Sequence, residues 1–297
     1  MIKLSVIILS YNTKDITRDC IEKLYKSLSA STSLESEIIL VDNASVDGSQ
    51  EMITTLKSSL QSKNVSYSYI FNQHNEGFPK GNNIGILNAK GEYVLFLNSD
   101  VIIDEVDWTE LLAYLDLHSQ VSALTVKVNL PKGGIDPASH RGFPTVWNSF
   151  CYYSKLEALT RHIPLLNSWF GGYHMTEKDL SSIHEVDAIS GAFFLARKKV
   201  VDELGGFDET YFMYGEDIDL AFRMKEKGYN VLYYPKYRVT HLKYQSGLKK
   251  GKKNTENKTK KYFYDAMRIF YKKHYEERNA WFVSQLVYFF INVRSRL

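Results

Sequence analysis

The chain has 297 residues, of which 44% are hydrophobic and 24% charged. These proportions are typical of a globular protein and exclude disordered and collagen-like classes, and the length fits one large α/β domain or two smaller ones. The formal net charge is only +3, but residues 241–297 hold 14 Lys and Arg against 4 Asp and Glu, so the rest of the chain is acidic. A basic tail indicates an anionic partner, such as anionic lipid or a diphosphate. Nucleic acid is not expected, because the tail has no recognisable reading motif.

The cysteines and the N-terminus bear on the compartment. Cys20 and Cys151 are too far apart in sequence to indicate a disulfide framework, which favours a reducing, cytoplasmic setting. The opening residues MIKLSVIILSY predict a first β-strand rather than a signal peptide, because the apolar run is short and no cleavage site follows. No stretch reaches the ~18 apolar residues of a membrane span.

The first hundred residues alternate strand and helix signals. Strands are predicted at 4–9, 38–41, 65–71 and 93–97, and helices at 15–28, 49–60 and 80–89. Strands separated by helices of this length predict a parallel, Rossmann-like sheet flanked by helices on both faces. Ligands of such sheets bind outside the carboxyl ends of the strands. We therefore expect Tyr11-Asn12, Asp42-Asn43 and Asn98-Ser99-Asp100 to lie in one crevice.

The rest of the chain is less regular. A helix is predicted at 108–118 and a strand at 122–128, whereas residues 131–185 read as a long irregular segment broken by Pro and Gly. Further on, the patterns predict a strand within 185–196, a helix ending at Leu204, a helix at 216–227 closed by Gly228, and a strand at 231–234. The polar residues 249–261 are expected to be flexible without a ligand.

Three acidic positions could carry chemistry, and each also has a purely local explanation. Asp100 follows an apolar strand directly, where it could bind Mg²⁺ or Mn²⁺ or simply cap a turn. Asp42 could accept a hydrogen bond from a nucleotide base, or form a turn. Glu216, Asp217 and Asp219 crowd a predicted helix start, where the helix dipole favours carboxylates, but beside aromatic residues they could also provide a general base.

Seven sequence features then occur in a specific order. They are SVIILSYN (5–12), VDNASVDGS (41–49), NEGFPKGNNIGI (75–86), LFLNSD (95–100), ISGAFFLARK (189–198), GGFDETYFMYGEDIDLAFR (205–223) and His241. Together they resemble the family-2 glycosyltransferases, which have a GT-A fold. The resemblance is greatest to bacterial rhamnosyltransferase-type members that build cell-surface polysaccharide. It implies a nucleotide-sugar-binding half (1–105), an acceptor and catalytic-base half (106–245), and a basic, helical C-terminal extension (246–297).

The resemblance also implies roles for individual residues. Asp217 would be the catalytic base with Glu216 beside it, and Asp100 with His241 would hold the divalent metal. The remaining positions would bind the nucleotide, the donor sugar or the acceptor: Ser10, Tyr11, Asn12, Asp42, Asn75, Gly77, Phe78, Asn82, Asn83, Asn98, Ser99, Gly191 and Ala192.

One residue departs from the family's Asp-x-Asp motif. Asn98 stands at its first position, where it can orient donor hydroxyls but adds no charge to a metal site. Asn at this position is common in rhamnosyltransferase-like members, which favours dTDP-rhamnose as the donor. UDP-linked galactose, glucose or N-acetylglucosamine stay open as alternatives, as does a non-catalytic nucleotide-sugar-binding domain of the same fold.

The implied reaction is an inverting transfer to an acceptor hydroxyl. Asp217 would take the hydroxyl proton, and the metal would neutralise the leaving diphosphate. The acceptor would be a glycan or a polyprenyl-diphosphate-linked sugar. Aromatic and basic residues at 262–275 and 280–293 favour peripheral contact with the inner face of the cell membrane. Packing on the body or a homodimer interface is the competing explanation.

Overall fold

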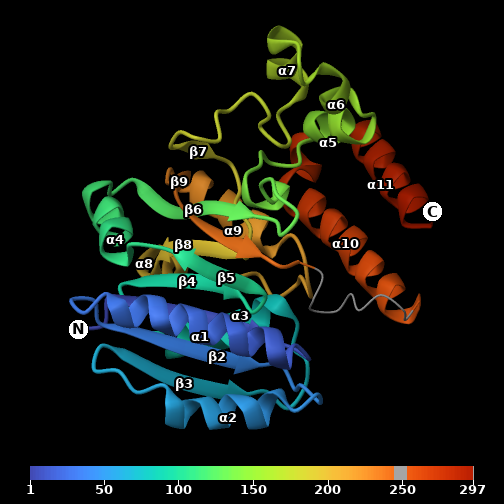
Figure 1. Cartoon of the computed structure of the whole chain (residues 1–297). Coiled ribbons are helices and arrows are strands. Elements are labelled where there is room, and N and C mark those ends of the chain that lie inside the picture. The colour runs from blue at the N-terminus through green and yellow to red at the C-terminus, as the bar shows by residue number, and fades with distance from the viewer. Residues whose placement is uncertain (244–252, 297) are drawn as a thin grey trace.

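The computed structural model of the chain describes residues 1–243 and 253–296. One sheet of nine strands runs through the molecule in the order β3-β2-β1-β4-β8-β6-β9-β5, with β7 also paired to β9 (Figure 1). The strands are β1 (Leu4–Ser10), β2 (Ser36–Asp42), β3 (Val65–Phe71), β4 (Tyr93–Asn98), β5 (Val101–Glu105), β6 (Val121–Asn129), β7 (His184–Val186), β8 (Phe193–Arg197) and β9 (Asn230–His241).

The helices connect these strands and extend beyond them. They are α1 (Lys14–Ala30), α2 (Ser49–Ser59), α3 (Phe78–Asn88), α4 (Trp108–Leu117), α5 (Val146–Tyr153), α6 (Leu156–Thr160), α7 (Pro164–Phe170), α8 (Lys198–Glu203), α9 (Glu216–Glu226), α10 (Lys253–His274) and α11 (Trp281–Arg296). Short 3₁₀ turns occupy Pro137–Ser139 and Glu276–Arg278. In Figure 1, α5 to α7 and α10 to α11 gather at the end of the molecule opposite β2 and β3.

The relative direction of the strands changes across the sheet. β1 to β4 are all parallel, as the alternating strand and helix signals predict. Beyond β4 the sheet is mixed, because β8 runs antiparallel to both of its neighbours and β5 antiparallel to β9. The register places Ser10 beside Asp42 and Leu9 beside Asn98, so the carboxyl ends of β1, β2 and β4 meet at one edge.

Each face of the sheet carries its own buried core. On one face, side chains of α1, α2 and α4 pack against the strands, with Trp108 fully buried. On the other face the core includes α8, α9 and also Ala266 and Phe270 of α10. The segment 262–275 therefore packs on the body of the protein through these two side chains. Of the two explanations for this part of the tail, the structure supports packing.

Three segments differ from the sequence-based expectation. Residues 131–185 are not irregular throughout, since α5, α6 and α7 lie within them. The strand expected within 185–196 is two separate strands, β7 and β8. The strand expected at 231–234 continues to His241. At Pro235 the pairing of β9 with β6 shifts register, between Val126 and Lys127 of β6, and the two strands then pair again.

The basic segment falls partly outside the described residues. Residues 249–252 are not described, whereas residues 253–261, expected to be flexible, form the beginning of α10. Within 1–243 and 253–296, no helix combines the length and the hydropathy needed to cross a bilayer.

Candidate active site

A cavity of about 1990 Å³ opens at the carboxyl edge of β1 and β4. Near the strand ends its lining is polar and includes Ser10, Asn98 and Asp100. Farther out, its walls are aromatic and aliphatic side chains of α5, α10 and α11. Pockets for drug-sized ligands usually have about 300–1,000 Å³, so this cavity has room for more than one ligand.

Asp100, His241 and Asp136 form a buried row at one end of this cavity. The row is fixed by the backbone, because Val101 pairs with His241 between β5 and β9. Nδ1 of His241 lies 2.8 Å from Oδ2 of Asp136, and its Nε2 lies 3.2 Å from Oδ1 of Asp100. Lys243 donates to the other oxygen of Asp136 at 2.8 Å. The cluster therefore joins two carboxylates through one imidazole.

The charges of this row decide the protonation of the imidazole. Burial would raise the pKa of Asp136, but hydrogen bonds from His241 and Lys243 hold that pKa far below its usual range. Asp136 is then an acceptor only, so Nδ1 of His241 carries the proton of their hydrogen bond. Burial alone would lower the pKa of His241, but its interactions with Asp100 and Asp136 outweigh burial and raise it to about 9.

The chemistry of this row fits a divalent cation. Oδ1 of Asp100 is buried and receives no well-aligned hydrogen bond, although it lies at ion-pair distance from His241. Metal-binding histidines typically donate their other ring N–H to a carboxylate, as His241 does to Asp136. Among the described residues, no group of three or more His, Cys, Asp or Glu is arranged so that it could hold a metal ion. Mg²⁺ commonly uses one or two carboxylates together with substrate phosphates, so Asp100 and His241 would hold such an ion only together with ligands from a substrate.

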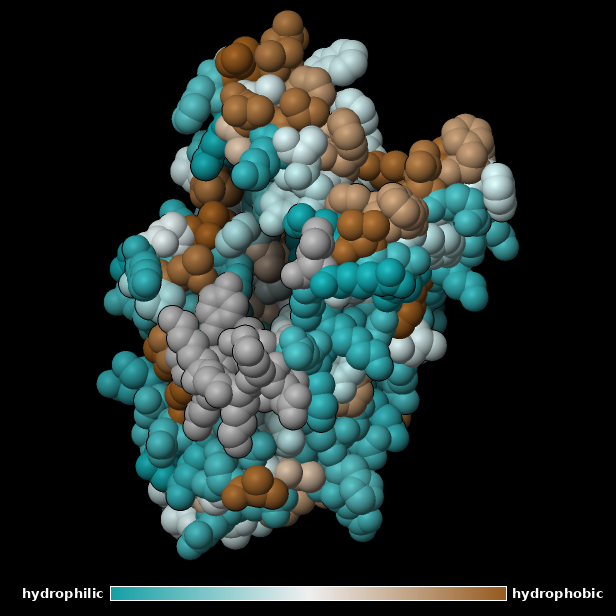
Figure 2. Space-filling view, turned by 90° about the vertical axis from the view of Figure 1, so that its right-hand side faces the viewer, coloured by the Kyte–Doolittle hydropathy of each residue, from teal (hydrophilic) through white to brown (hydrophobic). Residues whose placement is uncertain are grey.

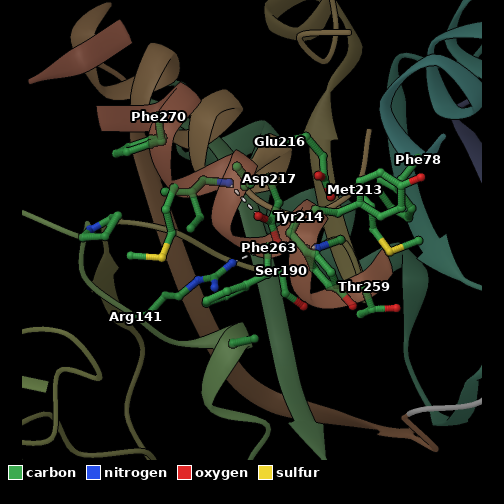
Figure 3. Close-up of a pocket in the computed structure, with 18 of the residues that line it drawn as sticks. Phe78, Arg141, Ser190, Met213, Tyr214, Glu216, Asp217, Thr259, Phe263 and Phe270 are labelled. Atoms are coloured by element: carbon green, nitrogen blue, oxygen red, sulfur yellow. Dashed lines mark hydrogen bonds and ion pairs between the residues drawn. The ribbon is translucent and has the colours of Figure 1, made fainter. Parts of the chain in front are cut away.

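Asp217 faces the same cavity from the first turn of α9, where Figure 3 shows it beside Arg141. Its Oδ2 accepts hydrogen bonds from Arg141 at 2.9 Å and from the backbone N–H of Gly191 at 3.3 Å. Its Oδ1 accepts from the N–H of Ile218 at 2.8 Å. One carboxylate of the helix start is thus directed into the cavity and held by three donors.

The neighbouring Glu216 lies in a different environment. Burial, together with the neighbouring negative charge of Asp217, raises the pKa of Glu216 to about 8. Its Oε2 is buried without a hydrogen-bond partner. The third carboxylate, Asp219, is turned away from the cavity and bonds Arg223, Lys273 and His274. The three acidic residues of this helix start therefore have three separate surroundings.

The opposite end of the cavity is a network of amides and backbone groups. The Asn43 amide donates to Asn75 Oδ1 at 3.2 Å and to the carbonyl of Gly77 at 3.0 Å. Gly77 has φ +82°, and a Cβ there would lie 2.6 Å from the carbonyl oxygen of Phe212, so no larger side chain fits. Asn12 also adopts a left-handed conformation, with its Oδ1 accepting from the N–H of Val46 at 2.8 Å.

Most of the predicted site residues meet in this cavity. The predicted residues that line it are Ser10, Tyr11, Asn12, Asn75, Gly77, Phe78, Asn98, Ser99, Asp100, Gly191, Ala192, Glu216, Asp217 and His241. Asp42, Asn82 and Asn83 do not line it. Asn82 bonds the carbonyl of Phe78, and Asn83 bonds Phe207 and Glu209, so both have structural partners. Asp42 is fully buried, with Oδ1 bonded to Ser45 and Gln50 and Oδ2 without a partner.

Three residues in the site were not assigned a role from the sequence. Asn43 was predicted only to lie near the crevice, as the residue after Asp42, and Asp136 and Arg141 come from the segment that reads as irregular. Arg141 is held in place by backbone hydrogen bonds with Ala188 in both directions. Nothing in the local pattern of residues 131–145 distinguishes these two side chains, because their partners, Asp217 of α9 and His241 of β9, are far away in sequence.

Two protein-family models match this chain, and both describe glycosyl transferases. The model described as "Glycosyl transferase family 2" matches residues 5–205, and the model described as "Glycosyl transferase family group 2" matches residues 157–294. Among curated proteins, the chain is 25% identical over 239 residues to the O-antigen biosynthesis protein RfbC of Myxococcus xanthus. That match covers 80% of this chain but 17% of the other protein.

Two further relatives are closer in length to this chain. The N-acetylglucosaminyl-diphospho-decaprenol L-rhamnosyltransferase of Mycobacterium tuberculosis is 26% identical over 76% of this chain and 73% of its own length. The rhamnosyltransferase WbbL of Escherichia coli is 27% identical over 56% of this chain and 60% of its own length.

Solved structures share the fold. The mannosyltransferase PcManGT from Pyrobaculum calidifontis, in complex with GDP-Man and Mn²⁺, matches with a TM-score of 0.59 at 15% identity, covering 91% of this chain and 64% of that one. S. aureus TarS in complex with UDP-GlcNAc matches with a TM-score of 0.52 at 19% identity, covering 90% and 65%. These neighbours are GT-A glycosyltransferases, so the expected fold class is confirmed.

Proposed function

Because the chain belongs to glycosyl transferase family 2, we propose that it transfers rhamnose from dTDP-rhamnose, with inversion, to a hydroxyl of a lipid-linked glycan. Asp217 is the base of this proposal, and Asp100 with His241 binds the donor's metal ion. The observation that carries it is the meeting of both groups in one cavity at the carboxyl edge of the sheet. The two rhamnosyltransferase relatives support the choice of sugar.

Each residue of the site has a separate role in the proposed transfer. An acceptor hydroxyl is a poor nucleophile, and Asp217 removes its proton as the new bond forms, a contribution of ~10²–10⁴ in rate. Arg141 and the N–H of Gly191 hold that carboxylate in position. Attack from the face opposite the diphosphate inverts the anomeric carbon. A divalent ion at Asp100 and His241 would supply Lewis-acid neutralisation of the leaving diphosphate.

The nucleotide binds, in this proposal, at the amide-rich end of the cavity. Tyr11, Asn43 and Asn75 border this end. Oδ2 of Asp42 is a buried acceptor without a hydrogen-bond partner, but Asp42 does not line the cavity, so a bond from the N–H of a pyrimidine base would require the side chains around it to move. Asn98 and Ser99 directly precede Asp100 in the chain and also line the cavity, where they would orient hydroxyls of the donor.

Transfer assays test the proposal. Purified protein is incubated with Mn²⁺, a sugar-diphosphate-lipid acceptor, and either dTDP-rhamnose or a UDP-linked sugar. We expect rhamnose transfer by the natural chain, and a loss of ~10²–10⁴ in turnover for Asp217→Asn with dTDP affinity retained. Asp202→Asn, a change in an exposed carboxylate paired with Lys198, is the matched control. Transfer from a UDP-linked sugar and not from dTDP-rhamnose would show that the proposed donor is wrong. Nucleotide binding without any transfer would favour a non-catalytic nucleotide-sugar-binding domain.

We also propose that the protein rests on the inner face of the cell membrane. Large apolar side chains are exposed on α7 and α11, including Trp169, Trp281 and Phe289. Figure 2 shows hydrophobic surface gathered at the top of the molecule, where α5 to α7 lie in Figure 1, and again at the height of α11. Patches of this kind mark interaction surfaces. Sedimentation with anionic vesicles tests the membrane, whereas a dimer in solution without vesicles would assign the patches to a second copy.

A further inference from the structure

The cavity extends well beyond the space that a nucleotide sugar needs. On leaving the strand ends, it continues between α5, α10 and α11. We call this part the apolar limb, defined by Tyr153, Phe263, Met267, Phe270, Leu286 and Phe290. In Figure 3, Phe270 and Arg141 lie on one side of Asp217, and Phe78 and Met213 on the other. Asp217 is therefore at the junction between the two parts of the cavity.

The apolar limb is a formed structure rather than a loose gap. The rings of Tyr153 and Phe290 pack edge to face with centroids 5.0 Å apart, which joins α5 to α11. The hydroxyl of Tyr153 lies 3.7 Å from the sulfur of Met267, which joins α5 to α10. A methionine in the wall suits an irregular aliphatic ligand, because its side chain is flexible and polarisable.

The outer part of the apolar limb is open. Leu286 is 64% exposed and Phe290 37% exposed although both line the cavity, so a ligand can leave the protein at this point. Among the described residues of α5, α10 and α11 that line the cavity, none is acidic or carries an amide side chain. A sugar chain would find few partners here, whereas a branched hydrocarbon chain would bury its surface at about 25 cal/mol per Å².

The inner part of the apolar limb has a charge that suits a diphosphate. Arg141 lines the cavity, and its Nε is buried without a hydrogen-bond partner, while one terminal nitrogen bonds Asp217. A guanidinium with free donors binds phosphate oxygens in a planar, bidentate manner. A hydrocarbon site, a guanidinium with one unpaired N–H and the carboxylate of Asp217 thus line a single cavity.

We propose that the apolar limb binds the isoprenoid chain of a polyprenyl-diphosphate-linked acceptor, with the diphosphate at Arg141 and the sugar hydroxyl at Asp217. The identity of the acceptor rests on the proposed function, whereas the hydrocarbon site rests on the cavity itself. The ligand class is further supported by the mycobacterial relative, whose name gives a diphospho-decaprenol acceptor.

A pair of adjacent phenylalanines provides a matched test. Phe290 lines the apolar limb, whereas Phe289 is 67% exposed on the same helix and does not line the cavity. The affinity of the full chain for geranylgeranyl diphosphate, below its micelle concentration, is measured for the natural protein, Phe290→Gln and Phe289→Gln. We expect Phe290→Gln to weaken binding about tenfold, because contact with a large apolar side chain is lost, and Phe289→Gln to leave it unchanged.

Further measurements keep the result interpretable. Inorganic diphosphate should bind equally to all three proteins, because it contacts no part of α11. Leu286→Gln, at a second and more exposed position of the limb, should reproduce the loss if Phe290→Gln lowers the melting temperature. Equal weakening by Phe289→Gln and Phe290→Gln would overturn the proposal, since it would indicate adsorption to the outer surface. Unchanged affinity in both Phe290→Gln and Leu286→Gln would overturn it as well.

The binding measurement is separate from the test of the proposed function. If no sugar is transferred from any donor, the affinity for geranylgeranyl diphosphate still decides whether the hydrocarbon site exists. If transfer occurs to an acceptor without a lipid chain as efficiently as to one with it, and Phe290→Gln changes neither, the glycosyltransferase proposal stands and the hydrocarbon site is refuted.

Discussion

Asp136 orients His241 by accepting its Nδ1–H at 2.8 Å, so that Nε2 points to Asp100. This relationship fixes the orientation of the ring. Because the pKa of His241 is raised to about 9, both ring nitrogens carry a proton at neutral pH, and a metal ion at Asp100 would have to displace the Nε2 proton of a ring that is already directed toward it. Asp136 is therefore as much a part of the site as the two residues that the sequence resemblance identifies.

Replacing Asp136 should weaken metal binding without removing a ligand. Asp136→Asn keeps the size of the side chain but loses the charge that holds the imidazole, and losses of this type typically reduce metal affinity 10–100-fold. Titration with Mn²⁺ in the presence of dTDP measures the effect. Asp104→Asn, in an exposed carboxylate bonded to Thr240 of the same strand pair, should change nothing. An unchanged Mn²⁺ affinity in Asp136→Asn would refute the assignment.

Arg141 and Asp217 should be energetically coupled. Their hydrogen bond is 2.9 Å long, and both side chains are largely buried, so screening by water is limited. A double-mutant cycle with Arg141→Met and Asp217→Asn should give a coupling free energy of about 1–3 kcal/mol in urea unfolding. The exposed pair Lys198 and Asp202 should give about 0.3–0.5 kcal/mol in the same experiment. Additive effects at Arg141 and Asp217 would contradict the prediction.

Glu216 should make the fold less stable as the pH rises. Its pKa is about 8 in the folded protein and close to 4.5 when unfolded, so between these values the folded state holds a proton that the unfolded state has released. Stability is then fully present below about pH 4.5 and is lost as the pH rises through about 8. Relative to the natural chain, Glu216→Gln should gain roughly 3–4 kcal/mol between pH 5 and pH 8.

Chemical denaturation at several pH values tests this sign. Glu203→Gln, in an exposed carboxylate near Lys227, is the control and should run parallel to the natural chain. If Glu216→Gln and Glu203→Gln show the same pH dependence, Glu216 is ionised in the folded state and the prediction fails.

Asp219 should anchor α10 to the body. Its side chain is fully buried and bonds Arg223, Lys273 and His274 at 2.7 Å each. Burial would raise the pKa of Asp219, but these partners lower it to about 2, so its contribution is present above about pH 4 and is lost as the pH falls through about 2. Asp219→Ala should cost about 3–5 kcal/mol, as expected when one partner of a buried ionic cluster is removed.

A carboxylate on the same helix serves as the comparison. Asp265 pairs with Arg268 three residues along α10, and both side chains are substantially exposed. Asp265→Ala should therefore stay within about 0.5 kcal/mol of the natural chain in urea unfolding at neutral pH. A similar cost for the two variants would indicate that Asp219 stabilises α9 alone and does not hold α10.

The sequence predicts the parallel half of the sheet well, because each strand there is a continuous apolar run followed by a polar turn. Asp100 is found in this way, since it follows β4 almost directly. The predictions are poorer from residue 131 onward for two reasons. α5 to α7 have only five to eight residues each, too few for a helical period to emerge. β9 contains Pro235, which normally ends a strand, and the strand persists because its register shifts there.

The site residues also differ in how well the sequence predicts them. Asp217 and His241 were assigned through an ordered set of motifs, since a helix-start carboxylate and a single histidine carry no signal alone. Arg141 and Asp136 have no motif around them, and their roles arise from contacts with α9 and β9. Asn83 is the opposite kind of error. Its place in a motif implied that it binds a ligand, but its amide donates to the backbone carbonyl of Phe207.

The pairing of β5 with β9 has a consequence for how the protein matures. Asp100 and His241 become neighbours only when these two strands, from distant parts of the chain, have joined. Contacts of such long sequence separation form slowly, because a large loop must close before they are made. A newly synthesised N-terminal half would present Asp100 without its imidazole. If the proposed metal ion binds at these two residues, its binding would report the moment at which the sheet closes during synthesis.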